Sequence, residues 1–315
     1  MRVFRTLSTA APTPVALTIG NFDGVHLGHQ AMLTRLTAVA HRLGMPSCVL
    51  TFEPHPREFF APDQAPARLT SLREKLELLA ESGVDRVHVC RFNFDFARTT
   101  PEEFIDRILK RGLAARWILV GDDFRFGSKR AGDFALLQQS GQALGFDAES
   151  LPTVEIAGER ASSTAVRLAL ASGDLARSAQ LLGRPYGISG RVMHGDKLGR
   201  DLGFPTANIQ LKHNRPPLLG IYAVEVFGLN GEPLPGVASL GRRPTVKGPD
   251  AIPVLEVHLF DFDAEIYGRR VRVDFLHKLR DEEKYPDLDS LIAQIKLDVD
   301  HAKHFLAQNT LARAL

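Results

Sequence analysis

The first half of the chain alternates short apolar runs with segments of helical periodicity. The apolar runs are rich in β-branched residues and too short to be helices, so each predicts a buried strand. They cover residues 15–19, 48–52, 87–90 and 117–120. Strands that alternate with helices predict a doubly wound α/β fold, in which helices cover both faces of a parallel sheet.

Two of the intervening helices have recognisable first turns. Ser71-Leu72-Arg73-Glu74 and Thr100-Pro101-Glu102-Glu103 are capping boxes, in which the hydroxyl and the carboxylate satisfy free backbone donors. Gly44 and Gly83 are placed to end the helices that precede them.

From about residue 185 the pattern changes to a period of two. Residues 221–227 alternate between apolar and polar, Asn230-Gly231 is a strong hairpin signal, and 254–260 and 271–275 are further strands with no helix between them. This half therefore predicts an antiparallel sheet, closed into a small β-barrel.

A last amphipathic helix follows Asp287. Its expected apolar face consists of Leu288, Leu291, Ile292, Ile295, Val299 and Phe305. A helix is also expected over 168–182, just before the sequence Gly183-Arg184-Pro185. We place the domain boundary there, which gives domains of residues 1–184 and 185–315.

The composition supports two domains of an ordinary globular protein. The chain has 315 residues, of which 44% are hydrophobic, and 39 Lys and Arg balance 37 Asp and Glu. This balance gives no reason to expect a nucleic-acid or membrane partner. Cys48 and Cys90 lie in apolar runs and are expected to be buried thiols. With no secretion signal or apolar span apparent, we expect a cytoplasmic protein.

The loop after the first strand is the strongest candidate site. It reads Gly-Asn-Phe-Asp-Gly-Val-His-Leu-Gly-His over residues 20–29. Ligands of doubly wound sheets bind beyond the carboxyl ends of the strands, where glycines and a helix N-terminus can approach a phosphate. His26 and His29 could stabilise charge on such a phosphate. A zinc site with Asp23 and a polar turn with solvated histidines remain alternatives.

Two later segments could complete an anion site. Residues 120–127 follow the end of another predicted strand. Another predicted helix begins with Ser162, Ser163, Thr164 and Arg167, although hydroxyl residues are also common helix caps. Residues 121–129 do not match a Walker A loop, because the spacing between Gly121 and Gly127 is one residue too long.

Together these motifs resemble a known family. His-Leu-Gly-His at 26–29 and Ser-Ser-Thr-Ala-Val-Arg at 162–167 are similar to motifs of the nucleotidyltransferase superfamily. Adding Thr-Phe-Glu-Pro-His-Pro-Arg at 51–57 and Gly-Asp-Asp-Phe-Arg-Phe-Gly at 121–127 narrows the resemblance to the adenylyltransferase half of bacterial bifunctional riboflavin kinase/FAD synthetases.

The resemblance implies a Rossmann-like nucleotidyltransferase domain that transfers AMP from ATP to FMN. His26 and His29 would contact the ATP phosphates, and Ser163, Thr164 and Arg167 would hold the outer ones. Other implied ATP-binding residues are Gly20, Phe22, Asp23, Gly28, Asp123 and Arg125, and Pro54, His55 and Pro56 would lie near the flavin. Ala161 stands where the family commonly has Ile. The FMN phosphate has a second pKa of about 6, so it needs no general base.

The second domain opens with a glycine-rich basic segment. Between residues 184 and 215 there are six Lys or Arg and two Asp, while the whole chain is nearly balanced. Such a loop can fold over phosphates, although glycines and charges alone are equally compatible with a flexible basic surface loop.

Pro205-Thr206-Ala207-Asn208 makes the assignment more specific, because it resembles the corresponding motif of riboflavin kinases. The resemblance implies that Thr206 and Asn208 hold Mg²⁺ beside ATP and that Glu256 is the base that activates the riboflavin hydroxyl. The implied ATP-binding residues here are Gly190, Gly195, Lys197, Gly199, Pro205 and Thr206, and the implied flavin-binding residues are Arg280 and Lys284. Tyr285 stands where the family often has Phe.

We therefore expect a bifunctional enzyme with a C-terminal riboflavin-kinase barrel and a terminal helix. Its partners would be riboflavin, FMN, FAD and ATP, with Mg²⁺ as cofactor and ATP as co-substrate, and a weak homo-oligomer is left open. An enzyme with one activity and a flavin-binding protein without turnover are the alternatives. Both sets of motifs are intact, which favours two activities.

Overall fold

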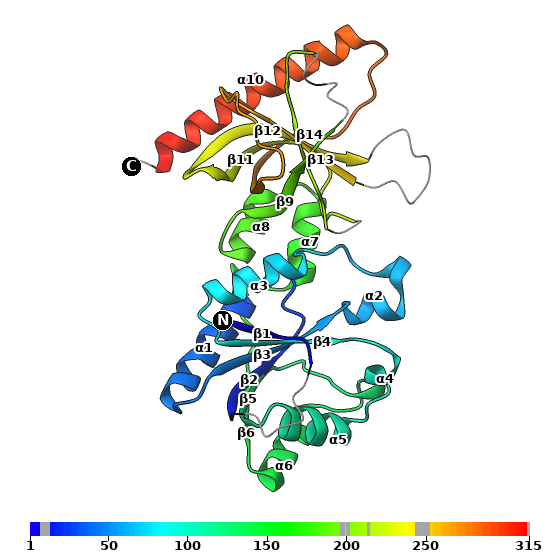
Figure 1. The fold of residues 1–315 in the computed structure, drawn as a ribbon, viewed down its shortest axis with the longest axis vertical. Helices are drawn as coiled ribbons and strands as arrows, with labels where there is room; N and C mark the ends of the chain where they lie inside the picture. The colour runs from blue at the N-terminus through cyan, green and yellow to red at the C-terminus, as the bar shows by residue number, and fades with distance from the viewer. Residues whose placement is uncertain (7–12, 196–198, 200–201, 213–214, 243–252, 314–315) are drawn as a thin grey trace. The chain divides into compact units, whose positions relative to one another are not determined.

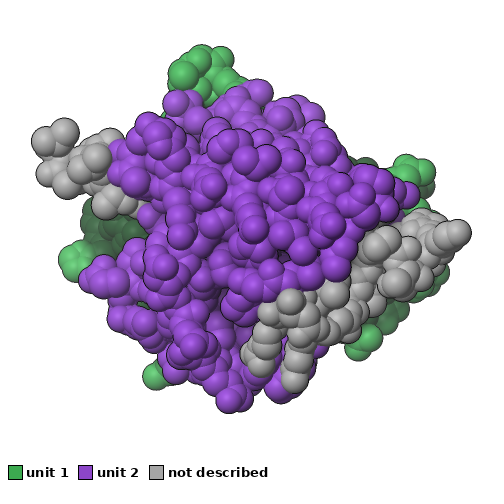
Figure 2. Space-filling model, turned by 90° about the horizontal axis from the view of Figure 1, so that it is seen from above, with its two compact units in different colours: residues 1–66, 72–163 green, residues 67–71, 164–315 purple. Residues whose placement is uncertain are grey.

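The computed structural model describes residues 1–6, 13–195, 199, 202–212, 215–242 and 253–313. The chain forms two compact units, shown in different colours in Figure 2. The first consists of residues 1–66 and 72–163, and the second of residues 67–71 and 164–315.

The first unit is built on a six-stranded parallel sheet (Figure 1). The strands are β1 (Arg2–Phe4), β2 (Val15–Ile19), β3 (Ser47–Glu53), β4 (Arg86–Arg91), β5 (Ala115–Gly121) and β6 (Asp147–Leu151). Their order in the sheet is β1-β4-β3-β2-β5-β6. The chain reverses its direction of travel across the sheet between β2 and β5, so the loops after these two strands meet at the place where doubly wound sheets bind ligands.

Helices cover both faces of this sheet, as the alternating pattern predicted. They are α1 (Leu27–Arg42), α2 (Pro56–Phe60), α3 (Leu72–Glu81), α4 (Phe94–Ala97), α5 (Pro101–Glu103) and α6 (Phe134–Leu144), with a π-helical segment η2 (Phe104–Gly112) and the short turns η1 (Pro62–Gln64) and η3 (Ser128–Arg130). A two-stranded ribbon, β7 (Glu155–Ile156) and β8 (Glu159–Arg160), precedes the last helices.

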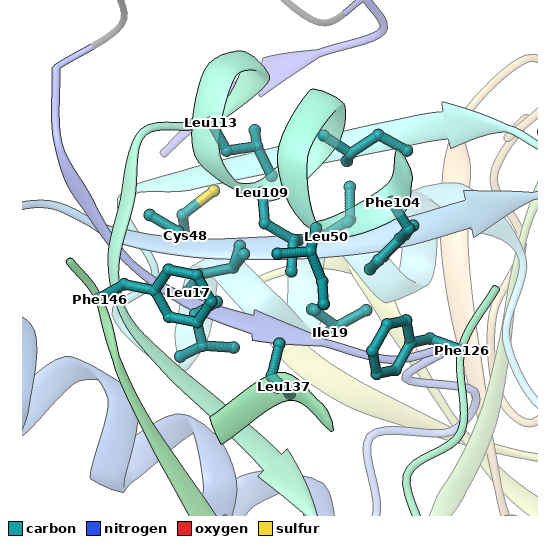
Figure 3. Packing of buried hydrophobic residues seen from close by; sticks show 14 of the residues in the cluster. Leu17, Ile19, Cys48, Leu50, Phe104, Leu109, Leu113, Phe126, Leu137 and Phe146 are labelled. Atoms are coloured by element: carbon teal, nitrogen blue, oxygen red, sulfur yellow. The ribbon is translucent and has the colours of Figure 1, made fainter. Parts of the chain in front are cut away.

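Successive side chains of β2 pack into the two hydrophobic cores on opposite faces of the sheet. Leu17 and Ile19 pack with η2 and α6 on one face, where Leu109 and Leu137 meet them (Figure 3). Ala16 packs with α1 and α3 on the other face. A strand buried on both faces is apolar throughout, which explains the continuous apolar run in the sequence.

The predicted helix ends agree with the structure where it describes them. Thr100 and Glu103 form both hydrogen bonds of a capping box at the start of α5. Gly44 and Gly83 follow α1 and α3 with φ of 63° and 77°, a conformation that glycine adopts without strain.

The expected helix over 168–182 is wrong, because the structure has two helices there. α7 (Ser163–Ala171) and α8 (Leu175–Leu182) are separated at Gly173, which has a φ of 79°. Asp174 then caps α8 by accepting a hydrogen bond from the Arg177 N–H. From Thr164 onward both helices belong to the second unit, and α8 packs on strands β9 and β14 of its sheet.

The second unit contains a closed antiparallel barrel, as predicted. Its strands are β9 (Tyr186–Met193), β10 (Ala207–Ile209), β11 (Gly220–Asn230), β12 (Glu232–Arg242), β13 (Pro253–Leu259) and β14 (Arg270–Arg280), in the order β10-β13-β12-β11-β14-β9. The predicted hairpin turn lies between β11 and β12, where Asn230 pairs with Glu232.

The terminal helix α10 (Leu288–Arg313) lies along the barrel (Figure 1). Val299 is buried against the barrel with Ala302 and Leu306, and Ile295 and Phe305 pack beside them. Leu288 was expected on this apolar face but is 52% exposed, because it stands at the first position of the helix.

Candidate functional site

The loop after β2 has an unusual backbone. Phe22 and Val25 have positive φ values of 49° and 42°, a conformation that is rare outside glycine. Their side chains are 0% and 1% exposed in the core below, and this burial holds the loop in its strained form. The chain then enters α1, with His26 as the residue that caps the helix.

The imidazole rings of the two candidate histidines stack on each other. Their ring centroids are 3.7 Å apart, and the Nδ1 atom of His26 is 3.4 Å from the His29 backbone N–H that donates to it. Gly28 permits this arrangement, because a Cβ there would lie 3.1 Å from the His26 ring and 3.1 Å from the Ala161 carbonyl oxygen. Gly20 is restricted in the same way by the ring of Phe22.

The environment of His29 favours the neutral imidazole. Burial lowers its pKa well below the ordinary value, and the positive charges of His26 and Lys75 lower it further. Its Nδ1 atom is buried and has no hydrogen-bond partner among the residues that the structure describes. The pair is therefore suited to offering hydrogen bonds to a ligand rather than to carrying two fixed charges.

The structure places only part of the motif at 162–167 beside the loop at 20–29. The Ser163 hydroxyl donates a 2.9 Å hydrogen bond to the backbone carbonyl of Asp23, which joins two segments 140 residues apart. Arg167 belongs to the second unit, where its Nε donates to the Ala67 carbonyl at 2.6 Å. The expected contacts of Thr164 and Arg167 with a triphosphate at the histidines stay predictions.

The loop after β5 carries exposed charged groups. Asp123 accepts a 2.7 Å hydrogen bond from Arg160, and Arg125 lies 3.9 Å from a carboxylate oxygen of Asp133. The neighbouring Asp122 accepts from the Thr153 hydroxyl at 2.8 Å, and this hydrogen bond lowers its pKa. The loop is followed by the short turn η3 rather than a long helix, in keeping with the rejection of a Walker A loop.

The loop after β3 contains the residues predicted near a flavin. Pro54 precedes His55, which caps α2 by accepting from the Arg57 N–H at 3.1 Å, and Pro56 is the first residue of that helix. Next to them the structure shows a cluster that the motifs did not indicate. The rings of Phe59, Phe60, Phe92 and Phe94 touch with centroids 4.9 to 5.6 Å apart.

Two members of this aromatic cluster are largely exposed. Phe60 is 67% and Phe94 is 70% exposed, which is unusual for side chains of this size. The signals in the sequence were the adjacent Phe59-Phe60 and the alternation of Phe92, Phe94 and Phe96, and alternating phenylalanines are equally typical of an ordinary strand.

In the barrel, Glu256 lies opposite Asn208. β13 alternates between buried and partly exposed residues, with Leu255 and Val257 turned to the barrel interior and Glu256 to its outer face. Asn208 of β10 is the direct register partner of Glu256, so the two side chains stand next to each other on that face. Ser239 of β12 is the register partner of Glu256 on its other side.

The surroundings of Asn208 fit a hard cation. Its Oδ1 atom is buried and has no hydrogen-bond partner within the described part of the chain, which is costly unless a ligand occupies it. An amide oxygen, a neighbouring hydroxyl on Thr206 and a carboxylate on Glu256 are the oxygen groups that Mg²⁺ prefers.

Glycines allow the backbone to approach this group closely. A Cβ on Gly195 would lie 2.2 Å from the Asn208 amide nitrogen, and one on Gly199 would lie 2.5 Å from the Phe204 carbonyl oxygen and 3.2 Å from the Thr206 hydroxyl. Gly190 packs on the backbone of Gln210 in the same way. Lys197, the remaining predicted ATP-binding residue, lies outside the described residues.

Arg280 is engaged inside the protein. It is a register partner of Ile221 at the end of β14, and its Nε and Nη2 atoms donate to Asp298 of α10 at 2.9 and 2.6 Å. These hydrogen bonds raise the pKa of Arg280. Its guanidinium also lies over the Tyr285 ring at 5.7 Å, while Lys284 is exposed.

Two alternatives can be compared with the geometry. Among the described residues, no three His, Cys, Asp or Glu side chains are grouped as a metal site, so nothing there supports the zinc alternative. Cys48 and Cys90 are free and buried as predicted, and burial raises the pKa of these thiols to about 12 and about 11. No helix in the described part of the chain is long and apolar enough to cross a membrane.

Comparison with known proteins gives matches over almost the whole chain. The family model for FAD synthetase matches residues 8–165, and the model for riboflavin kinase matches residues 182–306. A "bifunctional riboflavin kinase/FMN adenylyltransferase" of Escherichia coli strain K12 is 51% identical over 305 residues, which cover 97% of each chain. The chain belongs to this bifunctional family.

Other relatives agree with this membership. The bifunctional riboflavin kinase/FMN adenylyltransferase of Pseudomonas fluorescens is 52% identical over 92% of each chain, and that of Haemophilus influenzae is 50% identical over 92% of this chain and 94% of its own. A solved Streptococcus pneumoniae structure, titled as a macrolide-efflux protein, has a TM-score of 0.78 at 28% identity and covers 95% of this chain and 96% of its own. The expected family and the expected fold class are confirmed.

Proposed function

We propose that this chain makes FAD from riboflavin in two steps. Riboflavin is phosphorylated by ATP to FMN, and FMN is then adenylylated by a second ATP to FAD with release of pyrophosphate. The observation that carries the proposal is the succession of two family matches along one chain, with curated relatives of about 50% identity that span both.

We assign adenylylation to residues 1–184 and phosphorylation to residues 185–315. The family matches leave 166–181, most of α7 and α8, between them, and the compact units divide after Ser163, so the placement of these two helices in the first domain is part of the proposal. ATP phosphates would bind at the loop after β2. The neutral His29 and the cap of α1 at His26 stand at a helix N-terminus, where N–H groups can donate to an anion.

This adenylylation site needs no base, because the second pKa of the FMN phosphate is about 6 and the nucleophile is already ionised. Positioning and charge stabilisation are then the chemistry that the protein must supply. The exposed phenylalanines beside Pro54 and Pro56 offer an apolar surface for the flavin ring.

Phosphorylation of riboflavin has the opposite requirement. The 5′-hydroxyl is neutral and must lose its proton as it attacks the γ-phosphate, and a positioned carboxylate contributes about 10²- to 10⁴-fold to such a step. We assign this role to Glu256. Thr206 and Asn208 would hold Mg²⁺, which when bound neutralises charge on the phosphates, and the unsatisfied Oδ1 of Asn208 supports the assignment.

The remaining assignments stay predictions of the same proposal. A cytoplasmic location accords with two buried thiols that are free. Small molecules are the expected partners, without nucleic acid or membrane, and a weak homo-oligomer stays open.

Paired variants in the full-length protein test the two assignments. With riboflavin, ATP and Mg²⁺, wild type should form FMN and then FAD. Glu256→Gln should abolish FMN formation and leave FAD formation from supplied FMN, whereas His29→Ala should lower FAD formation at least tenfold and leave FMN formation. FMN without FAD from wild type, with oxidised or reduced flavin, would contradict the two-step proposal.

Two control variants match these substitutions in type. Glu232→Gln changes an exposed carboxylate of the same barrel, and His41→Ala changes an exposed histidine in the last turn of the same α1. Both should behave as wild type. Equal loss of both activities in Glu256→Gln would refute the assignment of separate sites.

A further inference from the structure

The pairing of β10 with β13 stops at the motif that we assign to Mg²⁺. Ile209, Asn208 and Ala207 pair with Leu255, Glu256 and Val257 in turn. The next pair in this register would join Thr206 to His258. Pro205 follows, and because proline has no N–H it cannot continue the ladder by donating to β13.

The side chain of His258 forms a hydrogen bond where the ladder ends. Its Nδ1 atom is 2.9 Å from the backbone carbonyl oxygen of Pro205, which lies 53 residues away in the sequence. A carbonyl oxygen can only accept, so Nδ1 carries the proton and donates. The backbone before Asn208 is thereby attached to the strand that carries Glu256.

The imidazole of His258 is held in position by two aromatic rings. It lies edge to face with Phe204 and Phe260, with ring centroids 5.6 and 5.9 Å away. Phe260 is buried under α10, and Phe204 packs against the same apolar cluster. The Nδ1–H donor of His258 is therefore held in its orientation by packing.

We propose that His258 is a positioning residue for the cation site of the riboflavin kinase. It acts through the Pro205 carbonyl and keeps the oxygen atoms of Thr206 and Asn208 beside Glu256, where they bind the cation of an Mg²⁺-nucleotide. His258 itself touches neither the nucleotide nor riboflavin. The inference rests on the proposed function, because it gives a role to a residue near the assigned cation ligands.

The size of the effect follows from the position of the hydrogen bond. Partners that orient metal ligands typically contribute about 10- to 100-fold to metal affinity. His258 holds a backbone carbonyl one residue before Thr206 and three before Asn208, so its loss should weaken Mg²⁺-dependent ADP binding by about tenfold. ADP binding in EDTA should hardly change, because the cation is then absent.

Two substitutions separate the hydrogen bond from ring packing. His258→Asn keeps an N–H donor near the position of Nδ1 but has no ring, whereas His258→Phe keeps the ring and its edge-to-face contacts but has no donor. The proposal expects near wild-type affinity for Mg²⁺-ADP in His258→Asn and the tenfold loss in His258→Phe. The reverse order would show that packing alone matters and would overturn it.

The measurement is titration calorimetry of the full-length protein with ADP in the presence of Mg²⁺ and, separately, of EDTA, fitted with two nucleotide sites because the first domain also carries a proposed ATP site. A ¹⁵N-edited histidine spectrum of wild type should also show the protonated nitrogen of His258 at Nδ1. His277→Ala is the control, since His277 lies on the same barrel but stacks on Phe305 at 4.5 Å. It should leave Mg²⁺-ADP affinity unchanged.

The outcome can be distinguished from failure of the proposed function. Circular dichroism and thermal unfolding of each variant report whether the barrel that carries His258 is folded. Mg²⁺-ADP affinity within twofold of wild type in a folded His258→Phe would refute the positioning role. A wild type that binds Mg²⁺-ADP but phosphorylates no riboflavin would instead refute the proposed function.

Discussion

The ion pair between Arg280 and Asp298 gives a stability prediction with a definite size. The side chains are 19% and 6% exposed, and Asp298 accepts from Nε and Nη2 of Arg280 and from the Gln294 amide at 3.0 Å. Asp298→Ala leaves the guanidinium buried without its carboxylate. Removing one partner of a buried pair costs about 3–5 kcal/mol, and the remaining exposure of Arg280 favours the lower end.

The expected loss is therefore about 3 kcal/mol, which corresponds to a fall in Tm of about 6–12 °C for a domain of this size. Differential scanning calorimetry of wild type and Asp298→Ala measures it. Asp281→Ala is the matched control: Asp281 also accepts from a cation, Lys278 at 2.6 Å, but is 82% exposed, so its loss should cost about 0.5 kcal/mol or less.

A double variant tests the reasoning further. Replacing both partners by Leu removes the unpaired charge, and well-packed apolar replacements of buried pairs are often neutral. Arg280→Leu with Asp298→Leu should therefore recover most of the lost Tm. A fall below about 2 °C in Asp298→Ala, or a double variant less stable than the single one, would refute the view that α10 is fixed to β14 by this pair.

Three further predictions concern Gly28, the buried Asp274 of β14 and His29. Gly28→Ala should lower FAD formation about tenfold with little change in Tm, because its Cβ would press on the Ala161 carbonyl and displace a candidate phosphate-binding segment; unchanged kinetics would contradict this. Burial raises the pKa of Asp274 to about 6, so between about pH 4 and pH 6 the folded state binds more protons than the unfolded state. The free energy of unfolding should therefore fall as the pH rises from about 4 to about 6. In Asp274→Asn this dependence of stability on pH should be lost, as measured by thermal unfolding. Because burial lowers the pKa of His29, binding of pyrophosphate beside it should take up protons near pH 6, seen as a buffer-dependent heat in calorimetry; a heat equally buffer-dependent in His29→Ala would argue against it.

The central strands could be predicted because burial leaves a direct trace in the sequence. β2, β3 and β5 are buried at most positions, and β4 is buried at Val87, Val89 and Cys90, so each contains a short apolar run. The edge strands were missed for the same physical reason: all three residues of β1 are exposed, and β6 is partly exposed throughout. An edge strand has polar and apolar residues in no fixed order, and its sequence does not differ from that of a loop.

Those parts of the candidate sites that lie in short continuous motifs could be predicted from the sequence. The loop after β2 and the motif at 205–208 stand at strand ends, where glycine, proline and hydroxyl residues are informative by themselves. The partners of these motifs come from distant segments. The hydrogen bond of His258 to Pro205 spans 53 residues, and the ion pair of Arg280 with Asp298 spans 18. No local pattern indicates such pairs, and only the folded barrel brings them together.

The two proposed sites differ because their nucleophiles differ in charge. FMN is already an anion, so a base would gain nothing, and the site must bind a second anion. We propose that the stacked histidine pair at the N-terminus of α1 does this through N–H donors. Riboflavin offers a neutral hydroxyl, so a general base accelerates its attack, and the charge of a carboxylate base must be offset beside the ATP phosphates. The pairing of Glu256 with Asn208 puts the proposed base next to a proposed ligand of the cation that would offset its charge. The proton requirement of each step thus accounts for histidines in one unit and a glutamate in the other.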